Sequence, residues 1–194
     1  LEIGAPVKEA VLSEQLGISR APIREALQVL VQEGLITSEP QKGKHVRQMT
    51  GKEIYDSYVV AGILEGAGVA ESLPLWTEAN METFRSVVRQ MEGKISYATK
   101  LDELAEIDEL FHATLFMACD NTRLVEMART SCATISKYLY YQHWITMFTP
   151  REYADRHHAV AEAVYSRDVK HVETALRDHY KETGLRMAQF GKEA

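Results

Sequence analysis

The stretch LSEQLGISRAPIREAL, residues 12–27, contains the end of one helical pattern and the start of another. The first pattern covers about residues 8–16, where apolar side chains recur on one face. Residues 17–19 then form a short break that begins with glycine, and the second pattern continues to about residue 33, just before another glycine. Two short helices joined by a tight turn are therefore predicted, as in a helix-turn-helix unit.

A β-hairpin is predicted directly after the second helix. Residues 35–38 read as a strand, residues 40–43 as a turn and residues 44–47 as the returning strand. Two helices followed by such a hairpin are typical of a winged helix-turn-helix domain. We place this DNA-binding domain in residues 1–49.

The second helix begins with side chains suited to DNA. Ser19 is a favourable N-cap, and Pro22 falls in the first turn, where proline is tolerated. This end of the helix reaches base edges in the major groove, where arginine can bind guanine or phosphate. The hairpin turn offers basic side chains for phosphate or minor-groove contacts. Taken singly, these residues also fit a solvated helix end and an ordinary turn. The predicted DNA contacts are Ser19, Arg20, Pro22, Arg24, Lys42, Gly43, Lys44 and His45.

Charge and composition limit the function classes. The net charge is −6, and residues 1–50 carry six basic and six acidic side chains, so the excess of acid lies in the rest of the chain. This argues against a protein that coats nucleic acid over its whole surface. It allows a local basic contact, because charges act over about 8–10 Å in physiological salt. Two cysteines and the lack of a long uncharged apolar run predict a cytoplasmic protein with no membrane partner.

The remainder of the chain, residues 50–194, reads as helices only. Capping boxes begin two of them, at Thr50 and Thr149, and short connections join all of them. An antiparallel bundle of about six helices is predicted. The expected helices cover about residues 51–73, 77–97, 102–118, 121–147, 150–167 and 168–190.

One carboxylate and three imidazoles fall on the apolar stripes of these helices. Asp108 and His112 are four residues apart and therefore lie one above the other, while His157 and His179 continue two further stripes. Buried groups of this kind are costly unless they are paired or bound to metal. The set predicts one divalent transition metal ion per chain, and zinc, nickel, manganese and iron all accept these ligands. Pairing of the aspartate with a histidine inside the core is the alternative.

Three features of the N-terminal part occur together in a known family. The sequence LSEQLGISRAPIREAL at residues 12–27 is followed by QEGLI at residues 32–36, and by Gly43 and Val46 in the hairpin. In this order they resemble the signature of the GntR family of bacterial transcription regulators. The resemblance implies binding to double-stranded operator DNA as a homodimer.

That resemblance also implies roles for single residues. Arg20 and Arg24 would be the recognition arginines, and Gly43 and His45 the contacts from the hairpin. Members of the family have a further helix before this stretch, which is absent from the sequence given. Some members carry arginine where this chain has Ala10, so we expect one DNA contact fewer.

The C-terminal part carries dispersed motifs within residues 108–112, 157–163 and 175–179, together with Leu64-Glu65 and Asn121. These are similar to the FCD ligand-binding domain of the FadR-type subgroup. The similarity implies that the aspartate and the three histidines hold a metal ion, beside which a small carboxylate binds. Many relatives carry arginine four residues before the glutamate, where this chain has Ala61.

The leading hypothesis is a transcription regulator whose operator binding responds to an organic acid bound at the metal. A metal-dependent enzyme built on the bundle is the second hypothesis, because three histidines and a carboxylate around an open metal position could activate water. No further general base is evident for it, and it leaves the N-terminal domain unexplained. A purely structural metal is the third.

Overall fold

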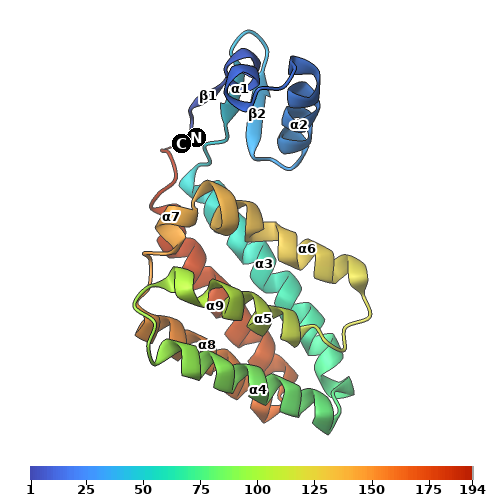
Figure 1. The fold of residues 1–194 in the computed structure, drawn as a ribbon. Coiled ribbons are helices and arrows are strands. Elements are labelled where there is room, and N and C mark those ends of the chain that lie inside the picture. The colour runs from blue at the N-terminus through green and yellow to red at the C-terminus, as the bar shows by residue number, and fades with distance from the viewer. Residues whose placement is uncertain (194) are drawn as a thin grey trace.

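The computed structural model describes residues 1–193. A small N-terminal unit lies at one end of a helical bundle (Figure 1). The predicted fold class, mostly helical with a winged helix-turn-helix unit and a bundle, is confirmed.

The N-terminal unit has its own small apolar core, formed by Val7, Ile23, Leu27 and Ile36. Gly17, with φ of 68°, adopts the left-handed conformation that ends the first helix, as the predicted break requires. The sheet is antiparallel in the order β1-β3-β2, and its first strand is too short to be read from a sequence pattern. The elements are β1 (Pro6–Val7), α1 (Glu9–Leu16), α2 (Arg20–Gln32), β2 (Ile36–Glu39) and β3 (Gly43–Val46).

The bundle begins at Thr50, whose hydroxyl group accepts the backbone N–H of Glu53 in a capping box. A second capping box, at Thr149, starts the helix that carries His157. Both helix starts were predicted, because they depend on neighbouring residues alone. The principal helices are α3 (Gly51–Ser72), α4 (Glu78–Ile95), α5 (Ala105–Leu115), α6 (Thr122–Ala133), α7 (Tyr141–Trp144), α8 (Pro150–Ser166) and α9 (Val169–Ala188).

The prediction of one helix over residues 121–147 is wrong. Residues Thr134–Leu139 form a π-helical segment, η3, in which the Tyr140 N–H donates to the Ile135 carbonyl oxygen at 2.9 Å. The short α7 then follows. Apolar periodicity continues across this break, so the sequence pattern does not reveal it. A smaller difference concerns the predicted helix 102–118, whose first turn is a 3₁₀ helix, η2 (Leu101–Leu104).

Helices α3 and α9 pack very closely, because glycine lies at their points of contact. A Cβ atom added at Gly62 would lie 2.8 Å from the Tyr180 Cβ, and one added at Gly184 would lie 2.8 Å from the Tyr58 Cβ. No side chain fits at these separations without a shift of one helix. The pair therefore forms a tightly fitted wall of the bundle.

The junction between the two parts is anchored by a buried tyrosine. The Tyr140 hydroxyl accepts the Met49 N–H at 3.0 Å and donates to the Met49 carbonyl oxygen at 3.3 Å. The same carbonyl oxygen accepts the Lys192 N–H at 2.9 Å, so the end of the described chain also binds here. The connection before α3 is thus fixed by two segments of the bundle.

Residues Gly51–Leu75 are long and apolar enough to cross a membrane by length and composition alone. In this structure they form the central helix α3 and the short 3₁₀ helix η1 (Leu73–Leu75), and 56% of the apolar window is buried inside the protein. Burial of this kind is ordinary for the core helix of a bundle.

Candidate metal centre and DNA-binding surface

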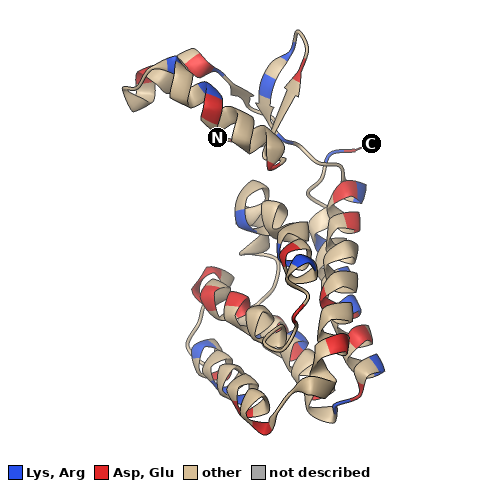
Figure 2. Ribbon diagram, turned by 90° about the vertical axis from the view of Figure 1, so that its right-hand side faces the viewer, with Lys and Arg blue, Asp and Glu red and all other residues tan. Residues whose placement is uncertain are grey.

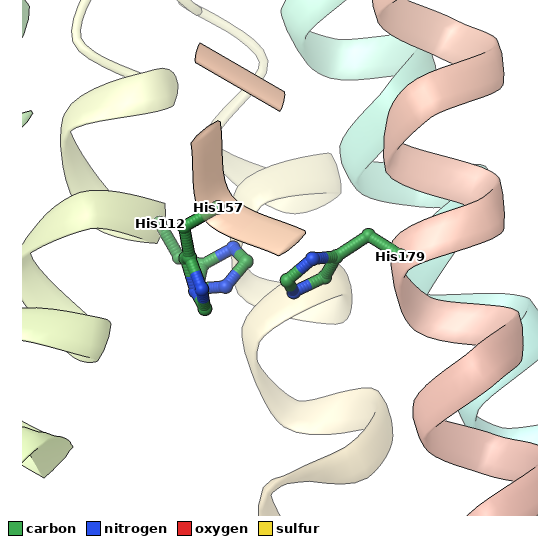
Figure 3. Close-up of side chains that lie close together, drawn as sticks. All are labelled: His112, His157 and His179. Atoms are coloured by element: carbon green, nitrogen blue, oxygen red, sulfur yellow. The ribbon is translucent and has the colours of Figure 1, made fainter. Parts of the chain in front are cut away.

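The three predicted histidines lie together inside the bundle. His112 comes from α5, His157 from α8 and His179 from α9, and Figure 3 shows their rings turned toward one another. One ring nitrogen from each residue lies within 4.8 Å of the others. Asp108, one turn before His112, places its Oδ1 atom 3.1 Å from His157 Nε2 and 4.0 Å from His112 Nε2. All four side chains that the helical periodicity predicted to face inward therefore lie close together.

The contacts of His157 suit a metal ion. Its Nδ1 lies 2.8 Å from the Tyr153 carbonyl oxygen, which can only accept, so Nδ1 carries the proton. Burial lowers the pKa of His157 despite the neighbouring Asp108. A neutral imidazole then turns its Nε2 lone pair toward a carboxylate oxygen. Two acceptors face each other, and a bound cation would satisfy both.

His112 has a second carboxylate behind it. Its Nδ1 lies 2.6 Å from Glu65 Oε1 on α3, and the other oxygen of Glu65 accepts the Tyr180 hydroxyl at 2.7 Å. Burial alone would lower the pKa of His112, but Glu65 outweighs it and raises the pKa to about 9. Histidines that ligate a metal commonly donate their second N–H to a carboxylate or carbonyl oxygen. Both His112 and His157 have such a partner.

His179 completes the cluster. Its Nδ1 is buried and has no hydrogen-bond partner within residues 1–193. Burial, with the nearby guanidinium of Arg156, keeps the pKa of His179 well below its usual value. The ring is therefore neutral, which is the form that binds metal.

Glu65 was not predicted as a site residue, although the sequence resemblance included it. Its side chain is 3% exposed. The available signal was a carboxylate on the inner face of an otherwise apolar helix, which needs a partner when buried. That partner, His112, lies 47 positions along the chain and was not visible from local sequence.

A cavity of about 390 Å³ opens beside the cluster. The four predicted metal ligands and Glu65 line part of it. Much of the remaining wall comes from α5, from α6 through α7, and from α8. A cavity of this size can hold a small organic ligand next to a metal ion.

The predicted DNA contacts lie at the start of α2 and on the β2–β3 hairpin, where basic residues lie on one strand and the turn and an acidic residue lies on the other strand (Figure 2). Ser19 occupies the N-cap position as predicted, but its side chain makes no capping hydrogen bond. Glu9 on α1 connects the two parts, since its carboxylate contacts Arg24 at 3.3 Å and Lys44 at 3.1 Å. Lys42 at the hairpin turn pairs with Glu39 instead. Arg20, Pro22, Gly43 and His45 occupy the predicted helix start and hairpin.

Comparison with family models finds two matches. Residues 56–182 match the FCD domain, and residues 1–46 match the model described as bacterial regulatory proteins, gntR family.

Curated relatives include the HTH-type transcriptional repressor RspR of Escherichia coli (strain K12). It is 26% identical over 193 residues, which are 98% of this chain and 82% of RspR. The Nta operon transcriptional regulator of Aminobacter aminovorans is 28% identical over 156 residues, or 79% of this chain and 70% of that protein.

Among solved structures, E. coli McbR/YncC superposes with a TM-score of 0.73 at 20% identity. The alignment covers 97% of this chain and 89% of that one. A GntR family regulator from Pseudomonas syringae pv. tomato has a TM-score of 0.60 at 22% identity, over 96% of this chain and 77% of its own. These two likenesses concern the fold.

Proposed function

The chain belongs to the GntR family of DNA-binding transcription regulators and carries an FCD domain, and from this premise we propose that a small organic acid, bound at a metal ion in the helical domain, controls its binding to operator DNA. Residues 1–49 would contact the operator and residues 50–194 would bind the ligand. We further propose that the chain acts as a cytoplasmic homodimer. The family consists of regulators and not of enzymes, so the hypothesis of a metal-dependent enzyme is set aside.

The proposal depends chiefly on one observation, the three histidine nitrogens within 4.8 Å of one another beside a cavity. Asp108, His112, His157 and His179 would hold the ion, with Glu65 orienting His112. The ion would supply a positive charge with an open coordination position for an oxygen atom of the ligand. The ligand set accepts zinc, nickel, manganese or iron.

Control of DNA binding requires that the ligand favour one arrangement of the domains over another. In a dimer, the two recognition helices must match half-sites about 34 Å apart. Residues 132–148 offer a path, because Cys132, Ser136 and Trp144 line the cavity and Tyr140 binds Met49 at the junction. A ligand that moves this segment would change the position of the DNA-binding domain.

The first test is elemental analysis of the chain purified without chelator, beside the His157→Ala variant. We expect about one transition metal ion per parent chain and little in the variant. His158→Ala is the matched control, because His158 is the next residue, is 42% exposed and pairs with Glu92 outside the cluster. Metal-free parent and variant proteins that are both folded would overturn the metal centre.

A second measurement separates regulation from a purely structural metal. Operator duplexes are first selected from a random library, and their affinity for the chain is then measured with organic acids, before and after chelation. Regulation through the metal predicts that chelation abolishes the effect of the acid. A structural metal predicts a lower melting temperature with the effect intact in the folded fraction.

A further inference from the structure

One arginine borders the cavity beside the histidine cluster. Arg156 precedes His157 on α8, and only 12% of its side chain is exposed. Its Nε donates to Glu182 at 2.9 Å, and its Nη2 donates to the Thr183 hydroxyl at 2.6 Å and to the His179 carbonyl oxygen. Its guanidinium carbon lies 4.0 Å from the centre of the Phe148 ring. The position of this charge is therefore fixed by three residues of α9 and by the Phe148 ring.

The third nitrogen of the guanidinium, Nη1, is left without an acceptor within the part of the chain described. This nitrogen is also not fully buried, so it keeps some solvent-accessible surface. A guanidinium has five N–H donors, and two of them lie on this nitrogen. Arg156 thus offers a rigid, unused pair of donors next to the cavity.

A second arginine provides an internal comparison. Arg186 packs on the same Phe148 ring, at 4.2 Å. Both of its terminal nitrogens are occupied, by Glu152 at 3.2 and 3.3 Å and by Glu182 at 3.0 Å, and it does not line the cavity. Only the first of these two stacked arginines has donors free for a ligand.

The rest of the cavity wall limits the charge of that ligand. Besides the predicted metal ligands, Glu65 and Arg156, the charged side chains that line the cavity are Glu106, Glu109, Arg129 and Lys137, and their charges sum to zero. Lys137 is already paired with Glu109 at 2.9 Å. The lining also includes apolar side chains: Leu101, Ala105, Phe116, Ala128, Trp144 and Phe148. Glu106 pairs with Lys94 at 3.5 Å, and Arg129, which has no ion pair among the described residues, is exposed to solvent. A second negative charge on the ligand would therefore meet only a solvent-screened cation, whereas an apolar group would be well accommodated.

We propose that Arg156 is the specificity-determining anion-binding residue of this cavity, and that its ligand is a monocarboxylate with an apolar body. The inference rests on the proposed function, since it concerns the ligand of the same cavity. One carboxylate oxygen would accept from Arg156 Nη1, the other would face the metal centre, and the apolar body would lie against the apolar lining residues. A charge-assisted hydrogen bond from a buried guanidinium favours the anion over a neutral analogue.

The test uses calorimetric titration of the metal-loaded chain with acetate, butyrate and benzoate, and with the matching amides. In the parent we expect tighter binding as the apolar body grows, and each acid to bind more tightly than its amide. Arg156→Met should lower the affinity for benzoate by about 10- to 100-fold, the usual effect of losing a hydrogen bond to a charged group. Arg186→Met removes the other stacked guanidinium and should leave the affinity unchanged.

Arg156→Lys guards against misfolding, because it keeps a charge and a donor for Glu182. It should bind benzoate more weakly than the parent and retain the parent's metal content. Three results would each overturn the inference. In the first, no acid binds; in the second, the amides bind as tightly as the acids; in the third, both Arg156 variants keep the parent's affinity for benzoate. Metal content measured on the same samples distinguishes failure of the proposed metal centre from failure of the proposed role of Arg156. A metal-free parent that binds benzoate through Arg156 would refute the metal centre alone.

Discussion

Removal of one hydroxyl group, in Tyr140→Phe, tests the connection between the two domains. The Tyr140 hydroxyl is the acceptor for the buried Met49 N–H, at 3.0 Å. The Met49 carbonyl oxygen keeps a second donor, the Lys192 N–H at 2.9 Å, so the loss falls on the N–H. Leaving a buried donor unsatisfied costs about 1–3 kcal/mol. For a chain of this size, each kcal/mol lowers the melting temperature by roughly 2–4 °C.

Two measurements check this reasoning. Thermal and urea unfolding of Tyr140→Phe should show a fall in melting temperature of about 2–12 °C. We also expect zinc to change the affinity for operator DNA less than in the parent, so that the ratio of the affinities with and without zinc moves toward one. The reason is that residues 132–148, which line the cavity, no longer hold Met49 through Tyr140. Tyr138→Phe is the control, since Tyr138 is 64% exposed and should change neither quantity. An unchanged melting temperature with an unchanged zinc ratio would refute the role of Tyr140.

Three further predictions follow from other contacts. Gly184→Ala should destabilise the bundle by about 1–3 kcal/mol in urea unfolding, because the added Cβ would lie 2.8 Å from that of Tyr58; full stability would disprove the close fit. Glu9→Gln frees an arginine and a lysine, so binding to non-operator duplex should strengthen with a steeper salt dependence, whereas equal slopes would argue against the clamp. In the chain whose metal has been removed with a chelator, His112 gains a proton on folding because its pKa is raised to about 9. Its stabilising contribution is complete below about pH 6.5 and is lost as the pH rises through 9, which unfolding at several pH values should show as a falling midpoint.

Local sequence was sufficient for much of the fold. Thr50 and Thr149 begin helices through contacts with residues three positions away, and Gly17 ends α1 through its own backbone conformation. Helical phase likewise directed His157 and His179 inward from separate helices. These inferences succeeded because each depends on spacing within one element.

What the sequence did not reveal depends on contacts between distant segments. The break at η3 follows no glycine or proline, and Tyr140, directly after η3, binds a residue 91 positions away. Glu65 contacts His112 from another helix. Arg156 was not predicted as a site residue, because in the sequence an arginine next to a histidine looks like a pair of solvent-exposed side chains. Phase places a side chain on a face, but only the assembled bundle shows which groups meet there.

The close approach of α3 and α9 divides the cavity wall into parts with different mechanical freedom. Where Gly62 and Gly184 let the backbones nearly touch, either helix can slide or rotate only by forcing atoms into overlap. The cavity wall also contains the π-helical segment η3, whose hydrogen-bond register has an ordinary α-helical alternative. Displacement caused by a ligand should therefore concentrate in residues 132–148, while α3 and α9 move as one rigid body.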